Sequence, residues 1–90
     1  MNDQRHSERL TLEDTTVDVV DQESGVEFQG LGRDVSDGGL RFEASMEPPV
    51  GADMDVRLSG STSLKGKMKV IRVAPRQGRY EVAGLLSRAR

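Results

Sequence analysis

Two short groups of residues carry side chains suited to holding a ligand. Asp34, Ser36 and Gly39 are spaced as Asp-x-Ser-x-x-Gly, and Arg5 and Arg9 are spaced as Arg-x-x-x-Arg. Arginine can form bidentate hydrogen bonds with phosphate or with the O6/N7 edge of guanine, and it stacks on flat rings. A carboxylate and a hydroxyl add short hydrogen-bonding groups, and glycine lets a ligand approach the backbone. Together, these residue types indicate binding of an anion or a nucleotide.

The two motifs differ in how specific each is by itself. A random shuffle of this composition gives about one Arg-x-x-x-Arg pair, but gives Asp-x-Ser-x-x-Gly only about one time in ten. Ten of the 13 basic residues are arginine, which reflects either recognition of an anion at one point or a compositional bias. The simpler interpretation of the second motif is a tight turn whose polar side chains cap their own backbone. The presence of both motifs favours ligand binding.

The same sequence disfavours catalysis and metal binding. There is no cysteine, and the one histidine, His6, lies in a polar segment. A nucleophilic Ser36 would need a base and an oxyanion hole, and neither is recognisable in the sequence. We therefore expect no catalytic residue, no metal site and no cofactor. The net charge of −2 also argues against general binding to nucleic acid, which needs a strongly basic surface.

Lys65, Lys67 and Lys69 share one face of an expected strand and leave an alternative open. A small β-barrel could bind single-stranded RNA through such a stripe, although no aromatic residues are interleaved for base stacking. A solvated outer face, whose lysines also discourage pairing at a sheet edge, is the simpler interpretation.

The elements that would position these residues are short strands. Six segments favour strands, turn signals recur about every ten residues, and no segment has a helical period. A change of parity between Val70 and Ile71 predicts a β-bulge or a strong bend, and the Pro-containing segment 74–78 predicts a turn. Closure into a small all-β barrel is favoured because it removes exposed edges. The expected strands cover residues 15–20, 26–35, 40–44, 54–58, 64–73 and 79–86.

The chain is expected to form one domain over residues 10–90, preceded by a flexible polar arm over residues 1–9. No apolar run approaches the roughly 20 residues that a membrane helix needs, and the first residues do not resemble a signal peptide. We therefore expect a soluble, cytoplasmic protein that does not associate with membranes, and the lack of cysteine agrees with a reducing compartment.

In combination, the two motifs resemble those of the PilZ domain, a bacterial receptor for cyclic di-GMP. The Asp/Ser/Gly motif lies within Asp-Val-Ser-Asp-Gly-Gly-Leu-Arg-Phe, at residues 34–42. The likeness continues through Gly51, the strand from Gly66 to Val73, and the segment from Tyr80 to Leu85. It implies a six-stranded antiparallel β-barrel. Residues 87–90 are too few for the C-terminal helix that many members carry, so little or no such helix is expected.

The resemblance also implies a function and a site. The chain would bind cyclic di-GMP through Arg5, Arg9, Asp34, Ser36 and Gly39, with the arginine segment folding over the ligand. Ordering of the arm would transmit the signal to a downstream protein partner of unknown identity. An adaptor that binds a protein and no nucleotide is the alternative within this fold, and the arginine pair counts against it.

Overall fold

The computed structural model of the protein describes residues 9–89, in which all regular structure is β-strand. Six strands of 6 to 13 residues follow a first strand of two residues. They are β1 (Leu10–Thr11), β2 (Thr16–Asp21), β3 (Glu27–Val35), β4 (Gly39–Ala44), β5 (Asp53–Ser59), β6 (Leu64–Arg76) and β7 (Arg79–Arg88). The described residues contain no helix after β7, and none anywhere that could span a membrane.

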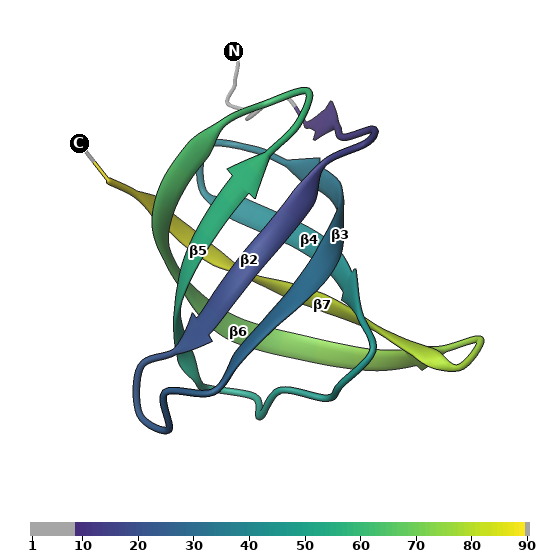
Figure 1. Ribbon diagram of the computed structural model, residues 1–90, viewed down its shortest axis with the longest axis vertical. Coiled ribbons are helices and arrows are strands. Elements are labelled where there is room, and N and C mark those ends of the chain that lie inside the picture. Colours follow the sequence, from purple (N-terminus) through teal and green to yellow (C-terminus); the bar gives the residue numbers. More distant parts are fainter. Residues whose placement is uncertain (1–8, 90) are drawn as a thin grey trace, which may run out of the picture.

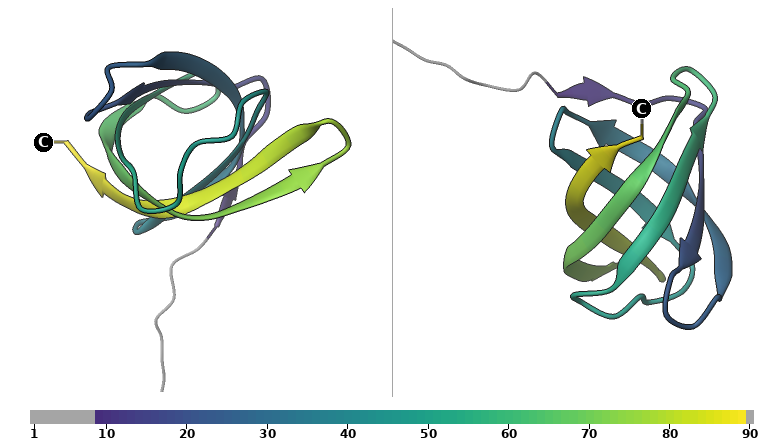
Figure 2. Two further views of the ribbon diagram at one scale, coloured as in Figure 1. Left: turned by 90° about the horizontal axis from the view of Figure 1, so that it is seen from below. Right: turned by 90° about the vertical axis from the view of Figure 1, so that its left-hand side faces the viewer.

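The six longer strands close into an antiparallel barrel, which confirms the predicted fold. Neighbouring strands follow the order β3, β2, β5, β6, β7, β4, and pairing of β3 with β4 closes the ring. The left-hand view of Figure 2 looks down this ring, and Figure 1 shows the strands crossing it obliquely. Strand β1 pairs only with the end of β3, where Thr11 lies opposite Asp34. Closure pairs the strands on both sides for much of their length and so leaves little exposed edge.

The barrel interior is filled by side chains that alternate along each strand. Alternation puts every second residue on the inner face, so short strands with apolar residues at every second position bury one face completely. The inner faces are buried in this way, since these residues are 3% exposed or less: Val17, Val19, Leu40, Phe42, Ala44, Met54, Val56 and Leu58. Phe42 and the partly buried Phe28 also contact each other, with ring centroids 6.4 Å apart.

A β-bulge interrupts the pairing of β6 with β7, as the parity change predicts. The register shifts between Val70 and Arg72. Val70 is buried, whereas Ile71 and Arg72 are both exposed. The bulge therefore turns two consecutive side chains to the outer face, where simple alternation would turn one of them inward.

A second bulge lies in β3, where the sequence pattern does not reveal it. The register between β3 and β4 shifts between Gly32 and Asp34. A Cβ at Gly32 would meet the core side chain of Leu12, so residue 32 faces inward, and Val35 is also buried. The two residues between them face outward. Uninterrupted alternation would put Leu31 on the same face as Val35, but Leu31 is 52% exposed.

The turn predicted over residues 74–78 is shorter than expected. Strand β6 continues to Arg76, and the turn consists of Gln77 and Gly78, both with positive φ (52° and 79°). Pro75 pairs with Tyr80 inside the ladder. It is tolerated because β5 pairs with β6 only as far as Lys69, so the nitrogen of Pro75 faces an unpaired side. The resulting hairpin projects beyond the barrel (Figures 1 and 2).

Replacing Gly84 by alanine should destabilise the barrel. An added Cβ would lie 2.4 Å from the carbonyl oxygen of Lys69 and 2.5 Å from Cε of Met68. Overpacking of this kind costs about 1–3 kcal/mol, and each kcal/mol lowers the melting temperature of a domain this size by about 4–8 °C. Thermal unfolding measures the effect. Gly38→Ala is the matched control, because nothing lies within 4 Å of its Cβ position. Equal melting temperatures for the two variants would contradict this packing.

Candidate functional site

Asp34 lies at the centre of a small network of arginines. Its backbone is paired with Thr11 on one side and with Arg41 on the other, so it occupies the middle of three strands. The Oδ1 atom accepts a hydrogen bond from Arg9, which immediately precedes β1. The Oδ2 atom accepts from Nε of Arg41 at 2.9 Å and also from its Nη2. Both carboxylate oxygens are thus occupied, and the side chain is only 9% exposed.

Arg41 is a residue that the sequence analysis did not select. It lies two positions after Gly39 and on the opposite face from Leu40 and Phe42. Alternation along β4 therefore places Arg41 on the same outer face as Gly39, and this pattern could have identified it from the sequence. Besides the two bonds to Asp34, its Nη1 lies 3.1 Å from Oε2 of Glu81. The hydrogen bond with Asp34 raises the pKa of Arg41. The guanidinium is therefore held in one position and stays charged.

Further ion pairs lie on the outer face of β3, β4, β6 and β7. Glu81 also pairs with Arg76 at 3.2 Å, and Glu43 pairs with Arg33 at 2.9 Å and more distantly with Arg79. These ion pairs form two groups: one links Arg9, Asp34, Arg41, Glu81 and Arg76, and the other links Arg33, Glu43 and Arg79. Five positive charges against three negative ones give this face a positive excess that favours an anionic ligand.

Ser36 lies in the loop between β3 and β4, and Gly39 is the first residue of β4. The amide of Ser36 donates to the carbonyl of Gly39 at 2.9 Å, and the carbonyl of Ser36 accepts from Arg88 at 3.3 Å. Within residues 9–89, no hydrogen bond occupies the hydroxyl of Ser36, and the carboxylate of Asp34 bonds to arginines instead of the turn backbone. Self-capping of the turn by these two side chains, the simpler interpretation of the motif, is therefore not what the structure contains.

Gly39 has neither a special backbone conformation nor a crowded environment. Its φ is outside the positive range, and a Cβ there would lie 3.4 Å from Oγ of Ser36 and 3.7 Å from the carbonyl oxygen of Gly84, which is ordinary contact. Neither the turn nor the packing requires glycine at this position. A side chain would instead project into the groove described next.

A groove of about 710 Å³ lies over the outer face of β4, β7 and β6. This volume is in the range of about 300–1,000 Å³ that is usual for small-molecule sites. Three of the predicted site residues line it: Arg9, Ser36 and Gly39. The remaining lining residues are Gly38, Leu40, Arg41, Ile71, Arg72, Ala83, Gly84 and Leu85. Asp34 lies behind the groove wall and reaches it through Arg9 and Arg41. Arg5 lies outside the described residues.

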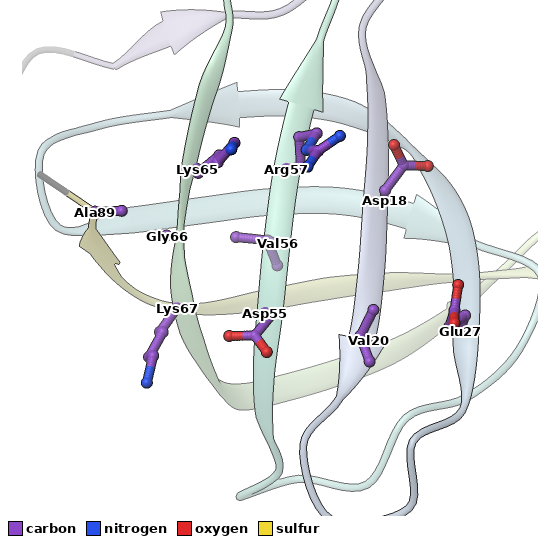
Figure 3. A pocket seen from close by; sticks show the side chains of 10 residues that line it. All are labelled: Asp18, Val20, Glu27, Asp55, Val56, Arg57, Lys65, Gly66, Lys67 and Ala89. Carbon is purple, nitrogen blue, oxygen red and sulfur yellow. The ribbon is translucent and has the colours of Figure 1, made fainter.

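A second groove, of about 550 Å³, lies on the opposite side of the barrel over β2, β5 and β6 (Figure 3). Its charged lining is balanced, with Arg57, Lys65 and Lys67 against Asp18, Glu27 and Asp55. Lys69, the third lysine of the stripe, pairs with Asp53 at 3.1 Å. Acids interleaved in this way reduce the positive potential that an RNA stripe needs. Within residues 9–89, no cluster of three acidic or histidine side chains is arranged for a metal ion.

Comparisons with known proteins add a family match. The family model described as "PilZ domain" matches residues 3–86. No curated protein matches the chain.

Solved structures match the fold. The complex of MrkH from K. pneumonia with c-di-GMP has a TM-score of 0.71 and 15% identity, covering 94% of this chain and 45% of that chain. The Bacillus subtilis inhibitor of motility MotI/DgrA has a TM-score of 0.70 and 15% identity, covering 94% of this chain and 43% of that one. Apo MrkH has a TM-score of 0.71 and 14% identity, covering 100% and 46%. The chain spans less than half of the length of these proteins.

Replacing Asp34 by alanine should destabilise the protein, because Arg9 and Arg41 lose the nearly buried carboxylate that accepts their hydrogen bonds. Hydrogen bonds to charged groups contribute about 1.5–3 kcal/mol each. Both arginines are partly exposed and can bond to water instead, so a net loss of about 2 kcal/mol is expected. Urea unfolding at neutral pH measures it. Asp37→Ala, in the exposed loop that follows β3, is the control. If both variants unfold at the wild-type urea concentration, Asp34 does not hold the network together.

Proposed function

Because the chain belongs to the PilZ domain family, we propose that it binds the bacterial second messenger cyclic di-GMP in the groove over β4, β7 and β6. One observation carries the proposal. The hydrogen bond between Arg9 and Asp34 joins the arginine motif to the Asp/Ser/Gly motif at the edge of a groove that Arg9, Ser36 and Gly39 line.

The groove offers the chemistry that this ligand requires. Cyclic di-GMP presents two phosphates and two guanines. Arg9, with Arg5 from the preceding segment, provides charge-assisted bonds to phosphate or a bidentate contact with guanine, which contributes about 1–3 kcal/mol of discrimination. The hydroxyl of Ser36 adds a hydrogen bond, and the bare backbone at Gly39 admits the ligand closely.

Asp34 acts here by orienting arginines. A free carboxylate could accept hydrogen bonds from the N1 and N2 donors of guanine, but both oxygens of Asp34 already accept from Arg9 and Arg41. A preorganised guanidinium loses less conformational freedom when the ligand binds, which improves affinity. Arg41 therefore joins the set of ligand-binding residues in this proposal.

The rest of the proposal concerns the biological role. The chain acts as a receptor in the cytoplasm and not as an enzyme, and a chain without cysteine suits that compartment. The comparison with MrkH, which was solved with c-di-GMP, supports the choice of ligand. Binding orders the segment 1–9 over the groove, and the changed surface is what a downstream protein partner recognises.

Titration calorimetry with cyclic di-GMP tests the ligand. The wild-type protein should bind, and Arg9→Ala should bind at least about tenfold more weakly, because it loses hydrogen bonds to a charged group. Arg5→Ala should show a loss of similar size. Lys67→Ala, on the opposite side of the barrel, is the control and should retain wild-type affinity.

The two alternative functions predict different binding results. A protein-binding adaptor gives no heat with cyclic di-GMP in the wild type. An RNA-binding barrel binds oligonucleotides with a steep salt dependence, loses this on changing Lys65, Lys67 and Lys69, and keeps it without Arg5 and Arg9. The absence of heat with cyclic di-GMP would reject the proposed function, and such RNA binding in its place would favour the second alternative.

Hydrogen exchange tests the ordering of the N-terminal segment. Saturating cyclic di-GMP should slow amide exchange in residues 3–9, because bonds from Arg5 and Arg9 to the ligand restrain the backbone. The amides of the hairpin turn at 77–78, away from the groove, serve as the internal control. Binding without any added protection of residues 3–9 would mean that the signal is transmitted by another route.

A further inference from the structure

The groove has a second wall, on β6, that neither motif supplies. The bulge between Val70 and Arg72 turns Ile71 and Arg72 together to the outer face, and both line the groove. Bulges recur beside binding sites because they redirect a side chain that plain alternation would place elsewhere. Here the redirected pair consists of one apolar and one cationic side chain.

The strand register places Arg72 opposite Arg41. Arg41 on β4 pairs with Ala83 on β7, and Ala83 pairs on its other side with Arg72 on β6. Two strand spacings separate the backbones of the two arginines, a distance of about 10 Å. All three residues line the groove, and the small side chain of Ala83 leaves a channel over β7 between the two arginines.

The floor beside this channel is apolar. Ile71 and Leu85 are 52% and 56% exposed, although both are large and hydrophobic. Leu85 pairs with Gly39, so the floor continues directly into the Asp/Ser/Gly loop. A flat ring lying on these side chains would cover apolar surface that is otherwise in water.

The guanidinium of Arg72 is available to a ligand. Within residues 9–89, no hydrogen bond or ion pair engages Arg72, whereas Arg41 and Arg76 are each held by acids. Arg57 on β5 is likewise not engaged in that part of the chain, but it lies in the charge-balanced groove on the other side of the barrel (Figure 3). Arg57 therefore provides a matched comparison.

From these observations we infer that Arg72 is a further ligand-binding residue and, with Ile71 and Leu85, forms the half of the site opposite Arg41. This inference rests on the proposed function. The guanidinium of Arg72 contacts a phosphate of cyclic di-GMP across the channel from Arg41, and a guanine ring lies on Ile71 and Leu85. A cyclic dinucleotide has its two phosphates on opposite sides of one ring, so cations on both walls suit it better than cations on one.

Titration calorimetry on matched variants tests this assignment. Arg72→Ala should weaken binding of cyclic di-GMP by about tenfold to a hundredfold, the range expected for lost bonds to a charged group. Ala83→Leu should weaken it at least as much by filling the channel. Arg57→Ala should bind as the wild type does. Melting temperatures should stay close to the wild-type value, because all three side chains lie on the outer face.

The outcomes separate this inference from the function on which it rests. If the wild-type protein binds cyclic di-GMP and Arg72→Ala binds equally well, the second wall is refuted and the proposed function stands. If the wild-type protein does not bind, both are refuted. A selective loss in Arg72→Ala, with Arg57→Ala unchanged and the fold intact, supports the assignment. Ligand-induced NMR shifts at residues 71, 72, 83 and 85 would locate the contact, and their absence would count against it.

Discussion

The two-sided engagement of Asp34 is the interaction on which the site depends. One carboxylate accepts a hydrogen bond from Arg9 on one oxygen and from Arg41 on the other, at a position where three strands lie side by side. A carboxylate that is only 9% exposed is costly to desolvate unless hydrogen bonds occupy both oxygens. The arrangement therefore fixes two cations at once and ties Arg9, the residue before β1, to the barrel wall.

The two bulges explain how a small barrel can present so much chemistry on one face. In β3 the bulge places Arg33 and Asp34 outward together, and in β6 it does the same for Ile71 and Arg72. Regular alternation would turn one residue of each pair into the core, where a charge has no partner. Each irregularity thus adds a side chain to the outer surface without removing a neighbouring strand from the ladder. The groove lies between them, over β4 and β7.

Two of the glycines that line this groove, Gly39 and Gly84, suit their positions for different structural reasons. Gly84 faces the core, and a Cβ there would collide with the backbone of β6. Gly39 faces outward, with ordinary clearance and an ordinary φ. Packing accounts for Gly84, whereas at Gly39 only the open groove benefits from the missing side chain. This difference separates a residue required by the fold from one suited to a ligand, and a sequence motif cannot express it.

The sequence by itself determined the six longer strands, their inner faces and the turn that Asp34, Ser36 and Gly39 flank or form. All of these follow from spacing of a few residues along the chain, which local stereochemistry converts directly into geometry. Even the bulge at Ile71 was visible, because it leaves a change of parity in the apolar pattern. The bulge at Arg33 left no such trace, because glycine at position 32 has no apolar side chain to mark it in the sequence as an inward-facing residue.

Only the tertiary structure decided which residues face one another across the groove. Arg41 and Arg72 lie on strands that are separated by β7 in space and by some thirty positions in the chain, and their common neighbour Ala83 comes later still. The closure of the barrel sets that register, which depends on all six strands together and so has no local signal in the sequence.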